Sequence, residues 1–277
     1  MTINRIHHLD GCTMRPRGLP VNGRGILVGH VLAVELRSGD VVLVDSGIGR
    51  AARREPRRML GAAFVHGFRP DLSESGSVFA QLVNLGLADH VRHIVLTHLD
   101  VDHAGGLSDF PRATVHVHTR ELAAGSSVRG WNARMRYRTA LWGHGPRFRS
   151  FSDGGDSWNG FDGAQVLEGL TDEVVAIPLP GHTQGHVAVA VRSGENWLVH
   201  AGDCYFHGSS VGRDRNDVRW GAELFETVMA VDRRKVAANH ERLAELVART
   251  DRTFEVFSAH DPFEFDECRA PNGANER

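Results

Sequence analysis

The segment THLDVDHAGG, residues 97–106, limits what this chain can fold into more than any other part of its sequence. Directly after the mainly apolar run 93–96, it places four potential metal ligands within six positions: His98, Asp100, Asp102 and His103. A buried strand that runs into a tight loop ending in two glycines can aim such side chains at a common point. Imidazole together with carboxylate suits zinc, iron or manganese. The density of the cluster favours a metal site over a solvated acidic loop with two incidental histidines.

The composition is that of an ordinary globular protein. With 277 residues, of which 41% are hydrophobic, the chain can bury a substantial core, and we expect a single domain over residues 1–277. A formal net charge of −2 leaves no basic surface for nucleic acid. The sequence has neither a recognisable secretory signal nor a stretch long enough to span a membrane, so we expect a cytoplasmic protein without membrane attachment.

Strand-like and helix-like segments alternate along the chain. Aliphatic and β-branched runs predict strands at residues 28–36, 40–45, 93–97, 114–118, 173–178, 186–191, 196–201 and 253–258. Apolar residues at helical spacing predict helices at 77–87, 224–230 and 233–248. Two β-rich halves, each followed by helices, indicate two sheets packed together with helices outside. We expect a long irregular loop at about 125–163 and a polar C-terminal tail at about 264–277.

Three later segments place further candidate ligands after expected strands. PLPGHTQGH, residues 178–186, turns so that His182 can face inward, and HAGD, residues 200–203, ends a strand on Asp203. FSAHDP puts His260 in the same position after the last strand. The complete candidate set is His98, Asp100, Asp102, His103, His182, Asp203 and His260.

Tyr205 lies two positions beyond Asp203 and is a candidate catalytic residue. Its phenol could donate a hydrogen bond to the oxyanion that forms when an ester carbonyl is attacked. An aromatic side chain packed beneath the site is the alternative interpretation. We expect His186 to support the ligands rather than to bind metal, and His116 and His118 to lie outside the site.

Five motifs in order, DSG, THxxxDHxGG, PGHTxGH, GD and the late histidine, make the chain resemble the metallo-β-lactamase superfamily from about residue 26 to 261. The resemblance implies an αβ/βα four-layer sandwich, in which two mixed β-sheets carry helices on their outer faces. It also implies two divalent metal ions per chain. One ion would be held by His98, Asp100 and His182, and the second by Asp102, His103 and His260, with Asp203 bridging them.

Asp100 is a departure from the family pattern, which is usually HxHxDH. A carboxylate at this position adds a negative charge and an oxygen donor to the site. We therefore expect zinc as the metal, with iron or manganese more competitive than at an all-histidine site. The alternative is that Asp100 supports the ligands without binding metal.

The resemblance implies metal-assisted hydrolysis of a small molecule, in which two ions share a hydroxide and polarise the bond under attack. Asp102 would pass a proton to the leaving oxygen. A lactone or another carboxylic ester is the expected substrate, because the N-acyl homoserine lactonase branch looks similar around Asp203 and His260-Asp261. That branch, however, carries its tyrosine three residues after the bridging aspartate rather than two. Thioester hydrolysis of the glyoxalase II type and diiron redox or oxygen handling are the alternatives, and a homodimer is possible.

Overall fold

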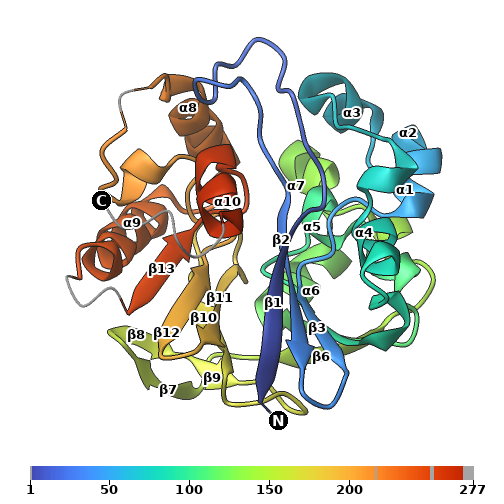
Figure 1. Cartoon of the computed structure of the whole chain (residues 1–277). Helices are drawn as coiled ribbons and strands as arrows, with labels where there is room; N and C mark the ends of the chain where they lie inside the picture. Colours follow the sequence, from blue (N-terminus) through green and yellow to red (C-terminus); the bar gives the residue numbers. More distant parts are fainter. Residues whose placement is uncertain (1, 216, 250–252, 271–277) are drawn as a thin grey trace.

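Two β-sheets face each other across a shared apolar layer, and helices cover the outer face of each sheet (Figure 1). The computed structural model describes residues 2–215, 217–249 and 253–270. Both sheets combine parallel and antiparallel neighbours. This arrangement is the αβ/βα sandwich that the sequence predicted.

The first sheet has six strands in the order of the chain. Its first three strands form an antiparallel meander, and the next three join in parallel. The strands are β1 (Ile3–Asp10), β2 (His30–Leu36), β3 (Val41–Val44), β4 (Val91–Val95), β5 (Thr114–His118) and β6 (Arg147–Phe151). The parallel strands β3 and β4 end at the same edge, so the residues that follow them meet there.

The second sheet has five strands in the order β13-β12-β11-β10-β9. Only β12 and β13 run in parallel. The strands are β9 (Gln165–Val166), β10 (Val174–Pro178), β11 (Val187–Ser193), β12 (Asn196–His200) and β13 (Phe254–Phe257). A separate hairpin joins β7 (Gly155–Trp158) to β8 (Phe161–Gly163).

Alternating apolar residues explain how the layers hold together. Leu32, Val34 and Val44 of the first sheet pack against Val187 and Val189 of the second. The opposite faces of both sheets pack against helices, as Ile94 does with Leu82 and Val199 with Leu243. Because strand residues alternate between faces, both sheets are apolar on two sides, which is why their strands read as nearly continuous hydrophobic runs.

The helices fall into two groups, one beside each sheet (Figure 1). Ser77 begins α4 by accepting a hydrogen bond from the Ala80 amide, and Asp232 begins α9 in the same way through two amides, as good N-cap residues do. The helices are α1 (Arg50–Arg54), α2 (Pro56–Met59), α3 (Ala62–Phe68), α4 (Val78–Asn84), α5 (Val101–Ala104), α6 (Thr119–Ser126), α7 (Gly130–Arg136), α8 (Trp220–Met229), α9 (Arg233–Val247) and α10 (Pro262–Arg269).

Two segments differ from the prediction. The stretch 125–163, expected as an irregular loop, contains α7, β6, β7 and β8. Residues 264–269, which we expected to begin a polar tail, belong instead to α10, which ends at Arg269. The rest of the expected tail, residues 271–277, lies outside the described part. A signal for α10 was present, because Asp261 caps the helix and Pro262 occupies its first turn.

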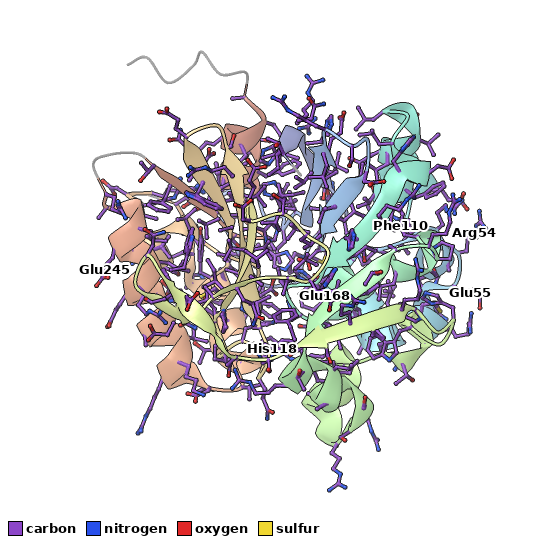
Figure 2. All side chains as sticks on the ribbon, turned by 90° about the horizontal axis from the view of Figure 1, so that it is seen from below. Arg54, Glu55, Phe110, His118, Glu168 and Glu245 are labelled. Carbon is purple, nitrogen blue, oxygen red and sulfur yellow. The ribbon has the colours of Figure 1, made fainter. Side chains whose placement is uncertain are left out.

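Seen from below, the space between the sheets is filled by side chains, while Arg54, Glu55 and Glu245 lie at the periphery (Figure 2). Within the described residues, no helix has both the length and the apolar character required to cross a bilayer.

Candidate metal centre

The first four candidate ligands follow β4 where it leaves the first sheet. His98 and Asp100 lie in the short loop between β4 and α5, and His98 Nε2 comes within 3.4 Å of Asp100 Oδ2. Asp100 then takes the N-cap position of α5, but its side chain makes no capping hydrogen bond and is available for other partners. Asp102 and His103 lie in the single turn of α5. The loop after β4 and the single turn of α5 therefore carry all four candidate ligands.

The other three candidates follow strands of the second sheet. His182 lies in the loop between β10 and β11, Asp203 follows β12, and His260 follows β13. Gly202, just before Asp203, has φ of 56°, and a Cβ there would come within 2.5 Å of the His186 ring. Only glycine fits this close turn without strain.

His98, Asp100, His182 and Asp203 form one converging set, and all four are buried. His182 Nε2 lies 3.2 Å from Asp100 Oδ2 and 3.4 Å from Asp203 Oδ2. His98 Nε2 lies 3.4 Å and 3.7 Å from the same two oxygens. Donor atoms placed around one zinc ion in a tetrahedron would be about 3.3 Å apart, so these spacings suit a shared metal.

Asp102, His103 and His260 form the second buried set. His260 Nε2 is 3.6 Å from Asp102 Oδ2 and 3.3 Å from His103 Nε2. Asp203 reaches this set through its other oxygen, because Oδ1 lies 3.0 Å from His103 Nε2 and 3.1 Å from His260 Nε2. Asp203 Oδ1 therefore faces the second set, whereas Oδ2 faces the first set and also lies 3.2 Å from His260 Nε2, so this carboxylate lies between the two sets.

The polar atoms of the two sets fit a pair of metal ions. Among the described residues, His98 Nε2 and Asp100 Oδ1 are buried without a hydrogen-bond partner, which is costly unless something else satisfies them. The other ring nitrogens are mostly in use: His103 Nδ1 contacts Asp45 Oδ2 at 2.8 Å, and His260 Nδ1 contacts the Val28 carbonyl at 2.7 Å. These contacts favour the tautomer that leaves Nε2 free for a metal.

Burial and neighbouring charges together set the pKa values of the candidate ligands. Burial alone would lower the pKa of His103, but Asp203 and Asp45 raise that pKa well above its usual value. Burial would likewise raise the pKa of Asp100, but Arg136 and His98 hold it well below the usual range. For His182, burial and Arg136 lower the pKa to about 4. Asp100 is therefore ionised and His182 is neutral at neutral pH, which are the forms that bind metal, whereas His103 carries a proton that it would release on binding a metal.

Three supporting residues were not predicted as part of the site. Asp45 accepts hydrogen bonds from the Thr97 amide at 2.8 Å and hydroxyl at 2.9 Å, besides contacting His103. Glu121 accepts from the amides of Leu99 and Gly185, both at 3.1 Å, and so fixes two ligand-bearing loops. Arg136 contacts Asp100 from α7. The DSG motif was the only sequence signal among these, for Asp45.

The histidines outside the predicted set lie where we expected. His186 Nδ1 donates a hydrogen bond to the Leu179 carbonyl at 3.0 Å, and His186 Nε2 accepts one from the Asp203 amide at 3.0 Å. His186 therefore helps to orient the candidate ligand Asp203. His116 is buried in β5 and pairs with His93, and His118 contacts Asp153. Neither His116 nor His118 belongs to the converging sets.

The catalytic role predicted for Tyr205 is not supported. Its side chain is fully buried in the core of the second sheet, and its hydroxyl donates to Glu264, with oxygens 3.1 Å and 3.2 Å away. Phe206, one residue further, faces the candidate site and stacks on His260, with the two ring centroids 5.1 Å apart. Because consecutive residues point in different directions here, the phenol lies away from the candidate ligands.

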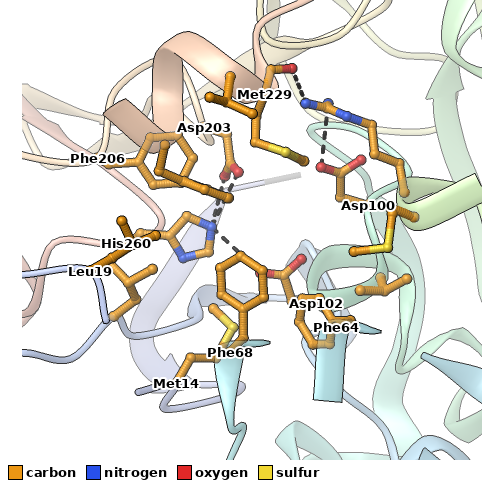
Figure 3. A pocket seen from close by; sticks show the side chains of 16 residues that line it. Met14, Leu19, Phe64, Phe68, Asp100, Asp102, Asp203, Phe206, Met229 and His260 are labelled. Carbon is orange, nitrogen blue, oxygen red and sulfur yellow. Dashed lines mark hydrogen bonds and ion pairs between the residues drawn. The ribbon is translucent and has the colours of Figure 1, made fainter. Parts of the chain in front are cut away.

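A cavity of about 250 Å³ opens over both sets. Asp100, Asp102, Asp203 and His260 point into it, and Phe64, Phe68, Phe206, Leu19, Met14 and Met229 surround it (Figure 3). The apolar side chains come from α3, α8 and the loop before β2, so segments far apart in sequence form its wall. The site thus combines a polar floor with an apolar wall.

Solved structures share this fold. A mutant of AiiA from B. thuringiensis, with N-decanoyl-L-homoserine bound at its active site, superposes with a TM-score of 0.70 at 19% sequence identity, and 98% of each chain is covered. An N-acyl homoserine lactone hydrolase with the product N-hexanoyl-L-homoserine at its catalytic metal centre gives the same values. The hydrolase AbOPH gives a TM-score of 0.60 at 19% identity, covering 95% of this chain and 90% of its own.

Sequence comparison gives relatives of higher identity. The probable metallo-hydrolases Rv2300c of Mycobacterium tuberculosis and Mb2322c of Mycobacterium bovis are 38% identical to this chain over 260 residues, which cover 93% of it and 80% of each relative. The sequence model of the metallo-beta-lactamase superfamily matches residues 24–203. The chain therefore belongs to the metallo-beta-lactamase superfamily, as the order of its motifs predicted.

Proposed function

We propose that this protein is a two-metal hydrolase that opens a lactone or cleaves another carboxylic ester bearing an apolar group. Membership of a metallo-hydrolase family supports the general reaction. The observation that carries the specific proposal is the placement of two His/Asp sets, joined by Asp203, on the floor of an apolar cavity.

In this proposal, His98, Asp100 and His182 hold one divalent ion, and Asp102, His103 and His260 hold the other, with Asp203 between them. Such a pair of ions, when bound, lowers the pKa of a water molecule and polarises the carbonyl that it attacks. Zinc is the metal we propose first. The spacing of the donor atoms is compatible with it, and the sets also include carboxylates, which iron or manganese would accept.

Asp102 is the proposed proton carrier. It is nearly buried, lines the cavity and lies 3.6 Å from His260 Nε2. A carboxylate in this place can take a proton from the attacking water and pass it to the leaving oxygen. Because Tyr205 points elsewhere, no phenol of the described residues reaches the cavity to stabilise the oxyanion.

The cavity wall supports a substrate with an apolar chain. Its lining includes four phenylalanines and three methionines, with charged side chains confined to Arg136 and the candidate ligands. Apolar cavities with a few convergent polar groups are typical of small-molecule sites. Two fold neighbours hold N-acyl homoserines, which combine an acyl chain with a product carboxylate. A substrate of this general build fits the floor and the wall together.

A substrate panel tests the proposal. The zinc-loaded protein should hydrolyse lactones or simple esters, and kcat/KM should rise with acyl length until the cavity is filled. The panel should include thioesters and phosphodiesters at equal concentration. A preference of more than tenfold for either of these over all oxygen esters would replace the proposed reaction.

Leu19→Trp sharpens the test, because Leu19 lies on the cavity wall and is only partly buried. We expect KM for long acyl chains to rise about tenfold, equivalent to about 1.4 kcal/mol of lost binding, with little change for short chains. Val83→Trp, at an exposed position on α4 away from the cavity, is the matched control. Equal effects of Leu19→Trp on all chain lengths would show that the chain does not occupy this wall.

A further inference from the structure

Arg136 joins three separate parts of the molecule at the candidate metal centre. Its side chain is 4% exposed and lies at the last position of α7. Nη1 donates to the His182 carbonyl at 3.1 Å and lies 3.4 Å from Asp100 Oδ2, while Nη2 donates to the Met229 carbonyl at the end of α8. Guanidinium groups are well suited to such multiple acceptors because their donors are fixed in one plane.

The position of Arg136 matters because the site contains three carboxylates, Asp100, Asp102 and Asp203. Within the described part of the chain, Arg136 is the only arginine or lysine within 4.0 Å of any of the three. The histidines of the two sets supply further contacts to Asp102 and Asp203. Asp100 differs in having a permanently charged partner.

We propose that Asp100 and Arg136 act as one unit, in which Arg136 is a positioning residue that offsets the charge Asp100 adds to the metal centre. The pair then contributes no net charge, as a neutral ligand at position 100 would. This inference rests on the metal centre of the proposed function, and it changes what the sequence led us to expect. Asp100 does not make the centre more negative, because its counter-charge is built into α7.

Arg136 also helps to position two residues of the cavity wall. Met135 and Met229 both line the cavity wall, and they belong to the two helix ends that Arg136 and its acceptors tie together. A guanidinium at the carboxyl end of α8 satisfies a carbonyl that the helix itself leaves free. The charge of the metal centre and the position of two wall residues therefore depend on the same side chain.

A double-mutant cycle tests the pairing through metal binding and thermal stability. Asp100→His supplies a neutral ligand but leaves Arg136 buried without its carboxylate. We expect this variant to bind zinc at least 100-fold more weakly than the parent, or to lose one ion. Asp100→His combined with Arg136→Met should recover to within tenfold of the parent, because a buried charge is costly mainly when its partner is removed.

Arg136→Met alone provides a second measurement. Without its guanidinium, Asp100 faces other carboxylates in the metal-free protein, whereas bound metal would neutralise them. The rise in Tm on adding zinc should therefore exceed that of the parent by at least about 4 °C. A residue that only ties the helices together would lower Tm equally with and without zinc. Arg136→Lys keeps the charge, so its zinc-induced rise in Tm should stay near that of the parent even if packing is weakened.

Arg138→Met is the matched control, since Arg138 lies two residues further on and donates to the Arg58 carbonyl instead. The effects of Arg138→Met on zinc affinity and on Tm should simply add to those of Asp100→His. Additive behaviour of Arg136→Met with Asp100→His, in a parent that binds two ions, would overturn the pairing and leave the proposed function intact. A parent whose Tm does not respond to any divalent metal would overturn the metal centre and the pairing with it.

Discussion

The histidines of the candidate metal centre differ in their contacts from those of a second cluster, in which His30 and His200 are buried and His8 is partly buried. In the candidate metal centre, histidines from both sheets converge on carboxylates. In the core cluster, which we define as His8, His30 and His200, the rings meet one another and the backbone. His8 Nδ1 lies 2.8 Å from His30 Nε2, and His200 Nε2 donates to the His30 carbonyl at 2.7 Å.

The two clusters differ in charge. Burial and neighbouring histidines lower the pKa of His8 to about 4 and that of His30 well below its usual value. Asp203 and its neighbours instead overcome burial at His103 and His260 and raise both pKa values. Among the described residues, the core cluster has no carboxylate within 4.0 Å of its ring nitrogens. Carboxylates, rather than histidines, thus distinguish a place for a metal from a packed core.

The largest expected effect comes from removing one of those carboxylates. Asp102→Asn keeps the shape of the side chain but cannot carry the charge or the proton, so kcat should fall by about 10²–10⁴-fold. Circular dichroism should show an intact fold. A variant that kept more than about a tenth of the parental kcat, a barrier change below about 1.4 kcal/mol, would remove Asp102 from the mechanism.

Tyr205→Phe should have a smaller effect, on stability instead of activity. The hydroxyl donates to buried Glu264, and its loss leaves that carboxyl without one partner, which costs about 1–3 kcal/mol of unfolding free energy. We expect kcat to stay within about twofold, below about 0.5 kcal/mol in the barrier. Urea denaturation measures the loss of stability, and steady-state kinetics measure any loss of turnover. A loss of turnover with unchanged stability would return Tyr205 to the catalytic site.

A further expected effect, on stability alone, is the acid sensitivity of the core cluster. Because the folded-state pKa of His8 is lowered to about 4 from 6.5, the unfolded chain binds more protons between these values. Stability should therefore be lost as pH falls from 6.5 to 4, by no more than about 3 kcal/mol for this residue. His8→Gln in the metal-free protein should flatten that part of the profile. An unchanged slope over this pH range would mean that His8 does not contribute.

The first four candidate ligands could be predicted from the sequence because they lie close together in it. The candidate ligands lie in short motifs after strands, so local pattern was enough to place His98, Asp100, Asp102 and His103 at one strand end. The structure brings these together with His182, Asp203 and His260, as the motifs implied. The apolar strands and both sheets followed from the same pattern.

Partners chosen by tertiary packing could not be predicted. Arg136 lies in a stretch that had no strong periodicity, and its contact with Asp100 depends on how α7 folds over the site. Tyr205 was misplaced because a difference of one residue decides which way a side chain points after β12. Distinguishing Tyr205 from Phe206 required the backbone itself.

Metal content per chain tests the central claim most directly. Protein purified without chelator and then saturated with zinc should contain two ions per chain by elemental analysis after removal of free metal. His30→Gln, which alters the core cluster, should also contain two, whereas His103→Gln should lose one. A parent that holds one ion or fewer after saturation with zinc, manganese and iron in turn would contradict the two-metal account.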